Sequence, residues 1–332
     1  MKGSGYENIS IKQEAEQELI RQSVEVHLDV GLAMAELPFK VANPQDLLPD
    51  NHNIAYKRML SVCRKYHHDV KVKNEILAAF EKLRSKGHLK YYEDLNIDQR
   101  TRLESKTGYT IPWDVVWKES LLSTPARTVF DASSKTSTGH SLNDVLATGT
   151  PDLVRLLDVL LDWHIGPVAF VGDVSQFYCS IGLLEKSWPF QKLLLKEDLN
   201  PYGKLIRAVI ISAIFGVCSS GGQSEEAVRK FCEIIKVEHD DIARLLLKAR
   251  YVDDIMKSMK AKNEVKTLIN KTEEVLNRIN MKIKGWCISG EDPPEELSED
   301  NNSIQFSGMI WFPKSDSFSI LARKSGERQV LR

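Results

Sequence analysis

The sequence predicts an α+β fold in which an antiparallel sheet carries helices on one face. Three observations support this class. Short apolar runs such as residues 168–174 are typical of buried strands. Longer stretches such as residues 153–161 repeat apolar side chains at helical spacing. The strand-like runs also come in neighbouring pairs, as within residues 114–131, which favours hairpins and antiparallel pairing.

The composition is that of an ordinary folded protein. The chain has 332 residues, of which 42% are hydrophobic and 27% charged. The net charge of −1 argues against a small basic binding module, but not against an enzyme with a locally basic groove. No apolar run approaches the roughly 20 residues of a membrane span, so we expect no membrane partner. Residues 1–10 do not resemble a signal peptide, and five cysteines without a C-x-x-C pair favour a reducing, intracellular compartment.

Helical patterns dominate the N-terminal part of the chain. Residues 9–28 form a weakly amphipathic pattern that is typical of a loosely held arm. A turn at residues 48–51 precedes a helix over residues 55–66, and a second helix ends at Gly87. The Lys and Arg residues of these two helices are most simply interpreted as a solvated face.

A hairpin is predicted next. Residues 114–118 and 127–131 are its two strands, and each carries one basic residue, Lys118 and Arg127. The hairpin therefore presents two cations, either as a surface feature or as a binding site for an anion.

The strongest candidate for a buried strand is residues 168–174, which contain the carboxylate of Asp173 near their end. Residues 193–195 and 208–211 are further strand candidates. Residues 215–222 form a Gly/Ser loop before a helix, and such a loop can offer backbone N–H groups to an anion.

Two adjacent acids, Asp253 and Asp254, stand between apolar and basic flanks. We expect residues 245–250 and 255–259 to be short strands and the two acids to form the turn between them. A buried carboxylate needs a counter-charge or a metal. A hairpin that presents two carboxylates therefore suits a divalent cation, and a solvated turn is the alternative interpretation.

Asp173 and Asp253 are 80 positions apart, so only the fold can bring them together. Antiparallel pairing of their strands would place all three acids at one edge of the sheet. Two divalent cations held there could activate a 3′-hydroxyl and neutralise a leaving pyrophosphate. Mg²⁺ prefers one or two carboxylates plus phosphate oxygens and water, which fits such a sparse set of ligands.

The C-terminal part continues the same pattern. Residues 265–279 are predicted to form an amphipathic helix, and residues 290–302 an acidic loop. Residues 306–311 and 318–321 are predicted to form a final hairpin.

Three of these stretches, in order, resemble motifs A, B and C of reverse transcriptases. They are Phe170-Val171-Gly172-Asp173 with Tyr178, Phe215-Gly216 with Ser219-Ser220, and Tyr251-Val252-Asp253-Asp254. The closer resemblance is to the BEL/Pao group of LTR retrotransposons, and it runs from about residue 36 to about residue 320. Further blocks that carry it are residues 48–51 with Lys57-Arg58, 111–120, 127–133, 141–144 and 308–316.

The resemblance implies the fingers and palm of a right-hand polymerase, with an antiparallel palm sheet. It divides the chain into an N-terminal arm (1–35), fingers (36–150), a palm (151–320) with an inserted fingers segment at about 185–212, and a basic tail (321–332). No room is left for a thumb. We therefore expect a portion of a polyprotein from which the thumb, RNase H and integrase domains are absent.

The resemblance also implies roles for single residues. Asp173, Asp253 and Asp254 would catalyse nucleotidyl transfer while holding two Mg²⁺ or Mn²⁺ ions, with the Val174 carbonyl as an extra ligand. Tyr178 stands at the position of an aromatic gate against the ribose 2′-hydroxyl, and a core aromatic is the alternative interpretation.

The nucleotide and the primer would be bound elsewhere. Arg127 and Lys118 would clamp the triphosphate of a dNTP, unless they are only surface charges. Phe215 and Gly216 would line the nucleotide and template side. The primer grip would comprise Met309, Ile310 and Trp311. An apolar core would explain those three side chains as well.

Two departures from the family pattern matter. Gly221-Gly222 follows the motif B serines where a proline is usual, which predicts a more flexible loop. Gly285 stands in the motif D stretch where a basic residue is usual, so Lys284 becomes the candidate general acid toward pyrophosphate.

Two functions follow as hypotheses. The first is an RNA- and DNA-directed DNA polymerase that uses a primed RNA or DNA template and dNTPs, in the cytoplasm, in virus-like particles or in the nucleus. The second is a catalytically impaired, retroelement-derived nucleic-acid-binding protein that keeps the fold. The intact acids favour the first, because drift would remove a costly cluster of like charges early. The missing thumb and Gly221 favour the second, and Tyr178 disfavours an RNA-directed RNA polymerase.

Overall fold

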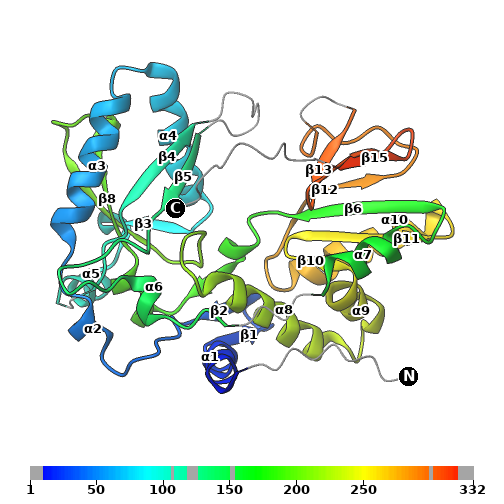
Figure 1. Ribbon diagram of the computed structural model, residues 1–332, viewed down its shortest axis with the longest axis horizontal. Coiled ribbons are helices and arrows are strands. Elements are labelled where there is room, and N and C mark those ends of the chain that lie inside the picture. The colour runs from blue at the N-terminus through cyan, green and yellow to red at the C-terminus, as the bar shows by residue number, and fades with distance from the viewer. Residues whose placement is uncertain (1–9, 106–107, 118–125, 150–153, 299–301, 321–332) are drawn as a thin grey trace. The chain divides into compact units, whose positions relative to one another are not determined.

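The computed structural model describes residues 10–105, 108–117, 126–149, 154–298 and 302–320 (Figure 1). The chain divides into two compact units, each described here by itself. The first comprises Met1–Leu153, Gln176–Val237 and Asn277–Met281, and the second comprises Val154–Ser175, Glu238–Leu276 and Lys282–Arg332. No helix within the described ranges is both long and apolar enough to span a membrane.

The first unit begins with a helix followed by a small sheet. Helix α1 (Ile11–Gln22) is capped by Ser10, whose side chain accepts from the Gln13 amide. The helix predicted over residues 9–28 was too long, because the alternating residues after Ser23 form strand β1 instead. The sheet has the order β1 (Val24–His27), β2 (Leu32–Ala35) and β7 (Ile181–Leu183).

Two long helices, α3 (His52–Tyr66) and α4 (Val70–Ser85), confirm the two predicted N-terminal helices. Asp69 caps α4 by accepting from the Val72 amide at 3.0 Å, and Gly87, with φ +76°, follows its end. Their apolar faces pack on a second sheet. Its order is β3 (Leu89–Tyr91), β9 (Leu205–Ile210) and β8 (Lys192–Lys196).

The predicted basic hairpin is present as β4 (Trp113–Trp117) and β5 (Ala126–Phe130), with Val116 opposite Arg127. Trp113 anchors it, because its indole donates to the Leu194 carbonyl at 2.8 Å. The remaining short elements of the first unit are α2 (Pro44–Leu47), η1 (Tyr92–Asp94), α5 (Ile97–Ser105), α6 (Leu142–Val145), η2 (Tyr178–Ser180), η3 (Glu185–Phe190) and η4 (Glu197–Leu199).

Helix α8 (Ser220–Ile235) corrects one prediction. The Gly/Ser loop was expected to reach residue 222, with Gly221-Gly222 as a flexible stretch. Both glycines instead lie in the first turn of α8, where the backbone hydrogen bonds of the helix fix them.

The second unit is built on a four-stranded sheet with the order β10-β11-β6-β12, all antiparallel. The strands are β10 (Arg250–Tyr251), β11 (Asp254–Met259), β6 (Val168–Val174) and β12 (Ile283–Ile288). The helices of this unit are α7 (Leu156–Trp163), α9 (Asp240–Lys248) and α10 (Lys262–Asn277). Together with the first unit, where β2 and β7 form a parallel pair and the other named pairs are antiparallel, this sheet confirms the α+β class with mainly antiparallel pairing.

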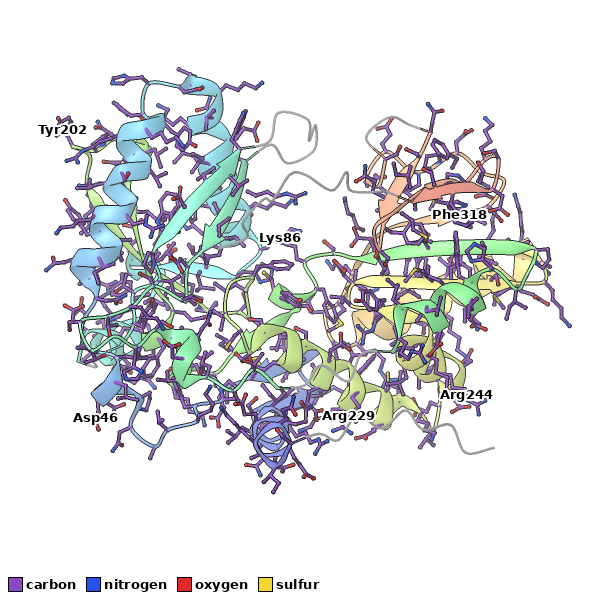
Figure 2. The ribbon with its side chains drawn as sticks, viewed as in Figure 1. Asp46, Lys86, Tyr202, Arg229, Arg244 and Phe318 are labelled. Atoms are coloured by element: carbon purple, nitrogen blue, oxygen red, sulfur yellow. The ribbon has the colours of Figure 1, made fainter. Side chains whose placement is uncertain are left out.

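A small sheet completes the second unit, with strands β13 (Ile304–Phe306), β14 (Met309–Phe312) and β15 (Ser317–Ile320). It was predicted as one hairpin, but residues 306–311 already contain a turn at Ser307-Gly308. Trp163 of α7 packs edge-on against Phe306 and Trp311, with ring centroids 5.4 and 5.0 Å apart. His164 packs in the same way on Phe318 of β15 (Figure 2).

Candidate active site

The sheet register brings the predicted acids together at one end of the second unit. Asp254, the first residue of β11, lies directly opposite Asp173 of β6. Asp253 occupies the adjoining turn, and its carbonyl accepts from the Val174 amide at 2.8 Å. Residues directly opposite in an antiparallel pair have Cβ atoms about 4.5–5.5 Å apart, so these acids are near neighbours.

The turn that carries Asp253 differs from the prediction. Residues 245–248 belong to α9 rather than to a strand, and the hairpin turn is Val252-Asp253, closed by the pair Tyr251 and Asp254. Val252 has φ +55°, a left-handed conformation that a β-branched residue rarely adopts. The surrounding structure must therefore hold this turn against local strain.

Arg250 holds the turn. Its side chain is only 5% exposed, and its guanidinium donates to the carbonyl of Val252 within the turn. A second donor nitrogen lies 3.3 Å from the Leu246 carbonyl at the end of α9. One buried side chain thus ties the turn to the preceding helix.

Burial raises the pKa values of all three carboxyl groups, and neighbouring carboxylates raise those of Asp173 and Asp254 further. Burial raises the pKa of Asp173, and the Asp253 carboxylate raises it further. Burial also raises the pKa of Asp253, although the Arg250 charge opposes this. Burial, the Asp253 carboxylate and Asp173 raise the pKa of Asp254 to about 7. The cluster is therefore short of positive charge.

Ser307 gives Asp254 its neutral partner. This residue lies in the two-residue turn between β13 and β14, and its hydroxyl donates to the Asp254 carboxylate at 3.1 Å. Ser307 and Gly308 have φ values of +45° and +81°, as a type I′ turn requires. The hydrogen bond lowers the pKa of Asp254 against the stronger raising effects.

Glycine at position 172 lets a tryptophan cover the strand beside Asp173. Gly172 pairs with Trp286 of β12, and a Cβ at Gly172 would lie 2.4 Å from the indole ring. The Trp286 ring donates to Glu273 of α10 at 2.9 Å, which fixes its orientation. Lys284, two residues before Trp286, is exposed and lowers the pKa of Asp173, so its charge reaches the acid cluster.

The ligand chemistry of this cluster fits a divalent cation. Mg²⁺ takes carboxylate oxygens, and a cation would offset the burial of all three carboxylates and the repulsion that further raises the pKa values of Asp173 and Asp254. Within the described ranges, however, no three His, Cys, Asp or Glu side chains converge as a closed metal site. The Asp254 carboxylate instead accepts the hydrogen bond from Ser307.

The predicted primer-grip residues lie on β14. Met309 and Trp311 are buried in the core of the second unit, and the Trp311 indole donates to Asp316 at 3.1 Å. Ile310 between them is partly exposed. Any contact of this strand with a ligand through side chains would therefore involve Ile310 rather than its two neighbours.

The residues predicted to bind the nucleotide belong to the first unit. The rings of Tyr178 and Phe215 lie 4.4 Å apart, and Phe215 is 65% exposed. Gly216 has φ +99°, and a Cβ there would lie 2.0 Å from the Phe130 carbonyl oxygen. Arg127 is exposed on β5. Lys118 lies outside the described residues.

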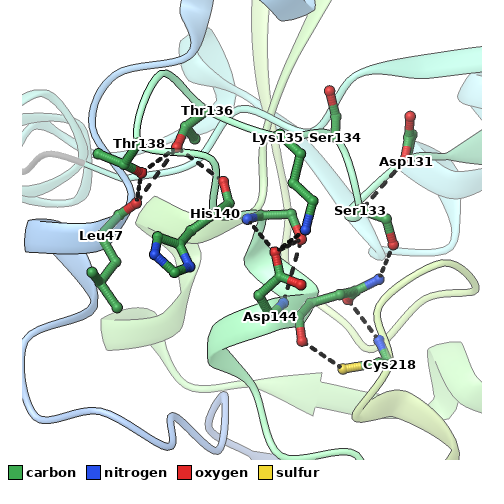
Figure 3. Close-up of polar contacts among 12 residues, drawn as sticks. Leu47, Asp131, Ser133, Ser134, Lys135, Thr136, Thr138, His140, Asp144 and Cys218 are labelled. Carbon is green, nitrogen blue, oxygen red and sulfur yellow. Dashed lines mark hydrogen bonds and ion pairs between the residues drawn. The ribbon is translucent and has the colours of Figure 1, made fainter.

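A polar network fixes the loop that joins β5 to α6 (Figure 3). Lys135 pairs with Asp144, and this ion pair lowers the pKa of Asp144 to about 2. Asn143 donates to the Ser133 hydroxyl at 2.8 Å and to the Gly216 carbonyl at 2.9 Å. The backbone beside Phe215 is therefore held in place by a side chain from α6.

Sequence reasoning did not identify Arg250 and Ser307 as site residues. The signal for Ser307 was available, because a Ser-Gly pair between two short apolar strands is typical of a hairpin turn. The sequence contains no such signal for Arg250, because the role of this residue depends on the position of α9.

The fold is similar to that of a reverse transcriptase. The chain is similar to a solved foamy viral protease-reverse transcriptase in complex with an RNA/DNA hybrid, with a TM-score of 0.52 and 14% sequence identity. The similarity covers 96% of this chain and 37% of the viral chain, so this chain spans little more than a third of that protein. No protein-family model matches the sequence, and no curated protein matches it either.

Proposed function

We propose that this chain is the fingers–palm portion of a reverse transcriptase, a nucleotidyltransferase that extends a primer on an RNA or DNA template with dNTPs. The observation that carries the proposal is the register that sets Asp254 opposite Asp173, with Asp253 in the adjoining turn. The reverse-transcriptase-like fold supports it. The resemblance of the ordered motif blocks supports the BEL/Pao group as the finer part of this proposal.

The domain assignment is part of the proposal. Residues 36–150, with the segment at about 185–212, would be fingers, and residues 151–320 the palm. The acid cluster would then lie in the palm. The thumb, RNase H and integrase domains would be supplied by other parts of a polyprotein.

The acids would position the reacting groups. Asp173, Asp253 and Asp254 would act as metal ligands through their carboxylates, and Val174 through its carbonyl. Two Mg²⁺ or Mn²⁺ ions bound there would activate the primer 3′-hydroxyl and neutralise the pyrophosphate. Arg250 and Ser307 would keep the Asp253 turn and the Asp254 side chain in place.

The remaining residues would bind the nucleotide and the primer. Arg127 and Lys118 would pair with the triphosphate, and Phe215 and Gly216 would line the nucleotide side. Tyr178, packed on Phe215, would exclude a ribose 2′-hydroxyl. The bond between the primer oxygen and the α-phosphorus forms while the bond to pyrophosphate breaks. Lys284 would donate a proton to pyrophosphate. The primer grip would be Ile310, held between the buried Met309 and Trp311 on β14.

A second candidate function is a catalytically impaired nucleic-acid-binding protein with the same fold. One observation favours it, namely that no three ligating side chains close around a single point among the described residues. The two candidates predict opposite outcomes for one assay.

That assay is primer extension by the purified chain with Mg²⁺ or Mn²⁺. The proposal predicts dNTP addition on both RNA and DNA templates by the wild type, loss of it in Asp253→Asn, and full activity in the surface control Asp292→Asn. Equal inactivity of the wild type and Asp253→Asn, with duplex binding intact, would establish the second candidate. Addition of rNTPs as efficiently as dNTPs would refute the gate role of Tyr178.

A further inference from the structure

Helix α3 carries an unusual concentration of positive charge. It holds four Lys or Arg residues and no Asp or Glu. Across residues 52–73 there are six Lys and Arg residues against a single Asp, in a chain whose net charge is −1. The charge of this segment is therefore opposite to that of the rest of the protein.

Ion pairing within the fold accounts for only part of this charge. Arg58 lies 3.7 Å from Asp114 and 3.6 Å from Asp131, and Lys73 pairs with Asp198 at 3.1 Å. The other cations have no ion pair within the part of the chain that the structure describes. They are Lys57, Arg64, Lys65 and Lys71, here called the basic surface.

The packing of α3 leaves Lys57, Arg64 and Lys65 of the basic surface exposed to solvent. Ala55, Met59, Val62 and Cys63 form the buried face of this helix. Lys57 and Arg64 lie two turns apart on the exposed side, roughly 10 Å along the helix axis. Two cations on one line at this spacing can reach separate charges of an extended anion.

Arg64 and Lys65 stand in the last turn of α3, where positive charge complements the helix dipole, but the charge of Lys71 does not serve helix stability in this way. Lys71 stands in the first turn of α4, which has no acidic residue. A cation there opposes the helix dipole, which favours negative charge at the N-terminal end. The Asp69 cap supplies one negative charge at this helix end, and an external anion beside Lys71 would supply another.

We infer that the basic surface binds the phosphodiester backbone of a nucleic acid. Lys and Arg contacts to phosphate need no base-specific groups, and cations outnumber the neutral polar residues Asn53 and Ser61 on the exposed face of α3. The binding of a nucleic acid does not depend on the proposed function. Only the identification of that nucleic acid as the primer–template rests on it. It replaces the simpler interpretation of these cations as a solvated face.

An anionic membrane is the less favoured partner. A helix that lies on a membrane inserts its apolar face, but the apolar face of α3 is already buried in the core of the first unit. The large apolar residue exposed on α3 is Ile54, at 39%.

The test compares two triple variants of the whole chain. Lys57→Gln, Arg64→Gln and Lys65→Gln together remove three cations from the basic surface. The control removes three cations that are already paired: Arg244 (Figure 2) with Asp240 at 2.7 Å, Lys266 with Glu291 at 3.7 Å, and Lys271 with Asp241 at 2.7 Å. Circular dichroism and thermal melting check that both variants fold.

Binding is measured by fluorescence anisotropy over a salt series, in EDTA and without nucleotide. One arm uses an RNA/DNA hybrid duplex, one a single-stranded RNA, and one vesicles of phosphatidylserine and phosphatidylcholine. The inference predicts that the first variant binds nucleic acid about tenfold or more weakly in at least one of the first two arms. The slope of log K against log salt should become shallower by roughly 0.9 per lost duplex contact or 0.7 per single-strand contact. The control should differ little from wild type.

Three outcomes would overturn the inference. They are unchanged nucleic-acid binding by the first variant, equal losses in both variants, and a loss confined to the vesicle arm. Because no catalysis is required, a failure of primer extension would refute the proposed function without altering this measurement.

Discussion

Asp254 lies directly opposite Asp173 across the pair β11 and β6, and its carboxylate accepts a hydrogen bond from Ser307. The first relationship places two like charges side by side. The Ser307 hydroxyl is a neutral donor that partly stabilises the Asp254 carboxylate against this repulsion. Together they define a cluster whose acids are close, partly buried and short of positive charge.

The hydrogen bond from Ser307 predicts a defect in metal affinity. A partner that orients a metal ligand typically contributes about 10–100-fold to affinity. Ser307→Ala should therefore raise the Mg²⁺ concentration needed for half-maximal primer extension by about tenfold. The rate at saturating Mg²⁺ should change much less.

The matched control is Ser315→Ala in the turn between β14 and β15, where the hydroxyl bonds, among the described residues, to Ser317 and the Phe312 carbonyl. It should leave the Mg²⁺ dependence unchanged. A Ser307→Ala protein with wild-type Mg²⁺ dependence would mean that Ser307 does not position Asp254.

Much of this arrangement could be predicted from the sequence, because strand alternation and an antiparallel plan already required Asp173 and Asp254 to share one sheet edge. The helical conformation of residues 245–248 could not be predicted. A short run of leucines fits a strand or a helix, and only the flanking Asp240 and Arg244, which pair at 2.7 Å one turn apart, show the helical spacing. The contact of Ser307 with Asp254 depends on packing between two sheets, which local patterns do not encode.

Gly172 should be required for the packing of Trp286. In Gly172→Ala the new Cβ would lie 2.4 Å from the indole, so the ring and β12 must shift. We expect a loss of about 1–3 kcal/mol in the free energy of unfolding, measured by urea denaturation. Gly221→Ala is the control, because its nearest neighbour would be the Tyr178 hydroxyl at 3.8 Å.

A double variant tests whether the clash with Trp286 causes this loss of stability. Gly172→Ala with Trp286→Ala should be more stable than the sum of the two single losses predicts, since the clash is then removed. Strict additivity would show that Gly172 and Trp286 do not interact.

The left-handed turn at Val252 should cost stability. A β-branched residue at φ +55° stores strain on the order of 1–3 kcal/mol, whereas glycine adopts this conformation freely. After allowing for the greater flexibility of glycine in the unfolded chain, Val252→Gly should stabilise the protein by about 1 kcal/mol. Val129→Gly, in the extended backbone of β5, should destabilise it instead. The strain at Val252 would be disproved if both substitutions destabilise equally.

The raised pKa of Asp254 predicts how the stability of the metal-free protein depends on pH. The native state holds this proton up to about pH 7, whereas the unfolded state loses it near pH 3.8. The stabilisation from Asp254 is therefore complete below pH 3.8 and is lost as pH rises to about 7. The side chain of Asn does not titrate, so Asp254→Asn does not lose this stabilisation as the pH rises.

Thermal melting in EDTA checks this prediction. Asp254→Asn should melt a few degrees above wild type at pH 8, and the difference should disappear near pH 4. Added Mg²⁺ should narrow the gap at pH 8 by stabilising the wild type. A wild type that is the more stable protein at pH 8 without metal would contradict the raised pKa.

In the proposed function, Asp173 and its partner Asp254 belong to the metal-dependent centre of a polymerase. Single-nucleotide incorporation in one turnover, with a primed template and Mg²⁺, tests it most directly. We predict that wild type adds one dNTP and that Asp173→Asn, which keeps the size of the side chain, is slower by a factor of about a thousand or more. Incorporation by Asp173→Asn at the wild-type rate would show that Asp173 is not part of a catalytic centre.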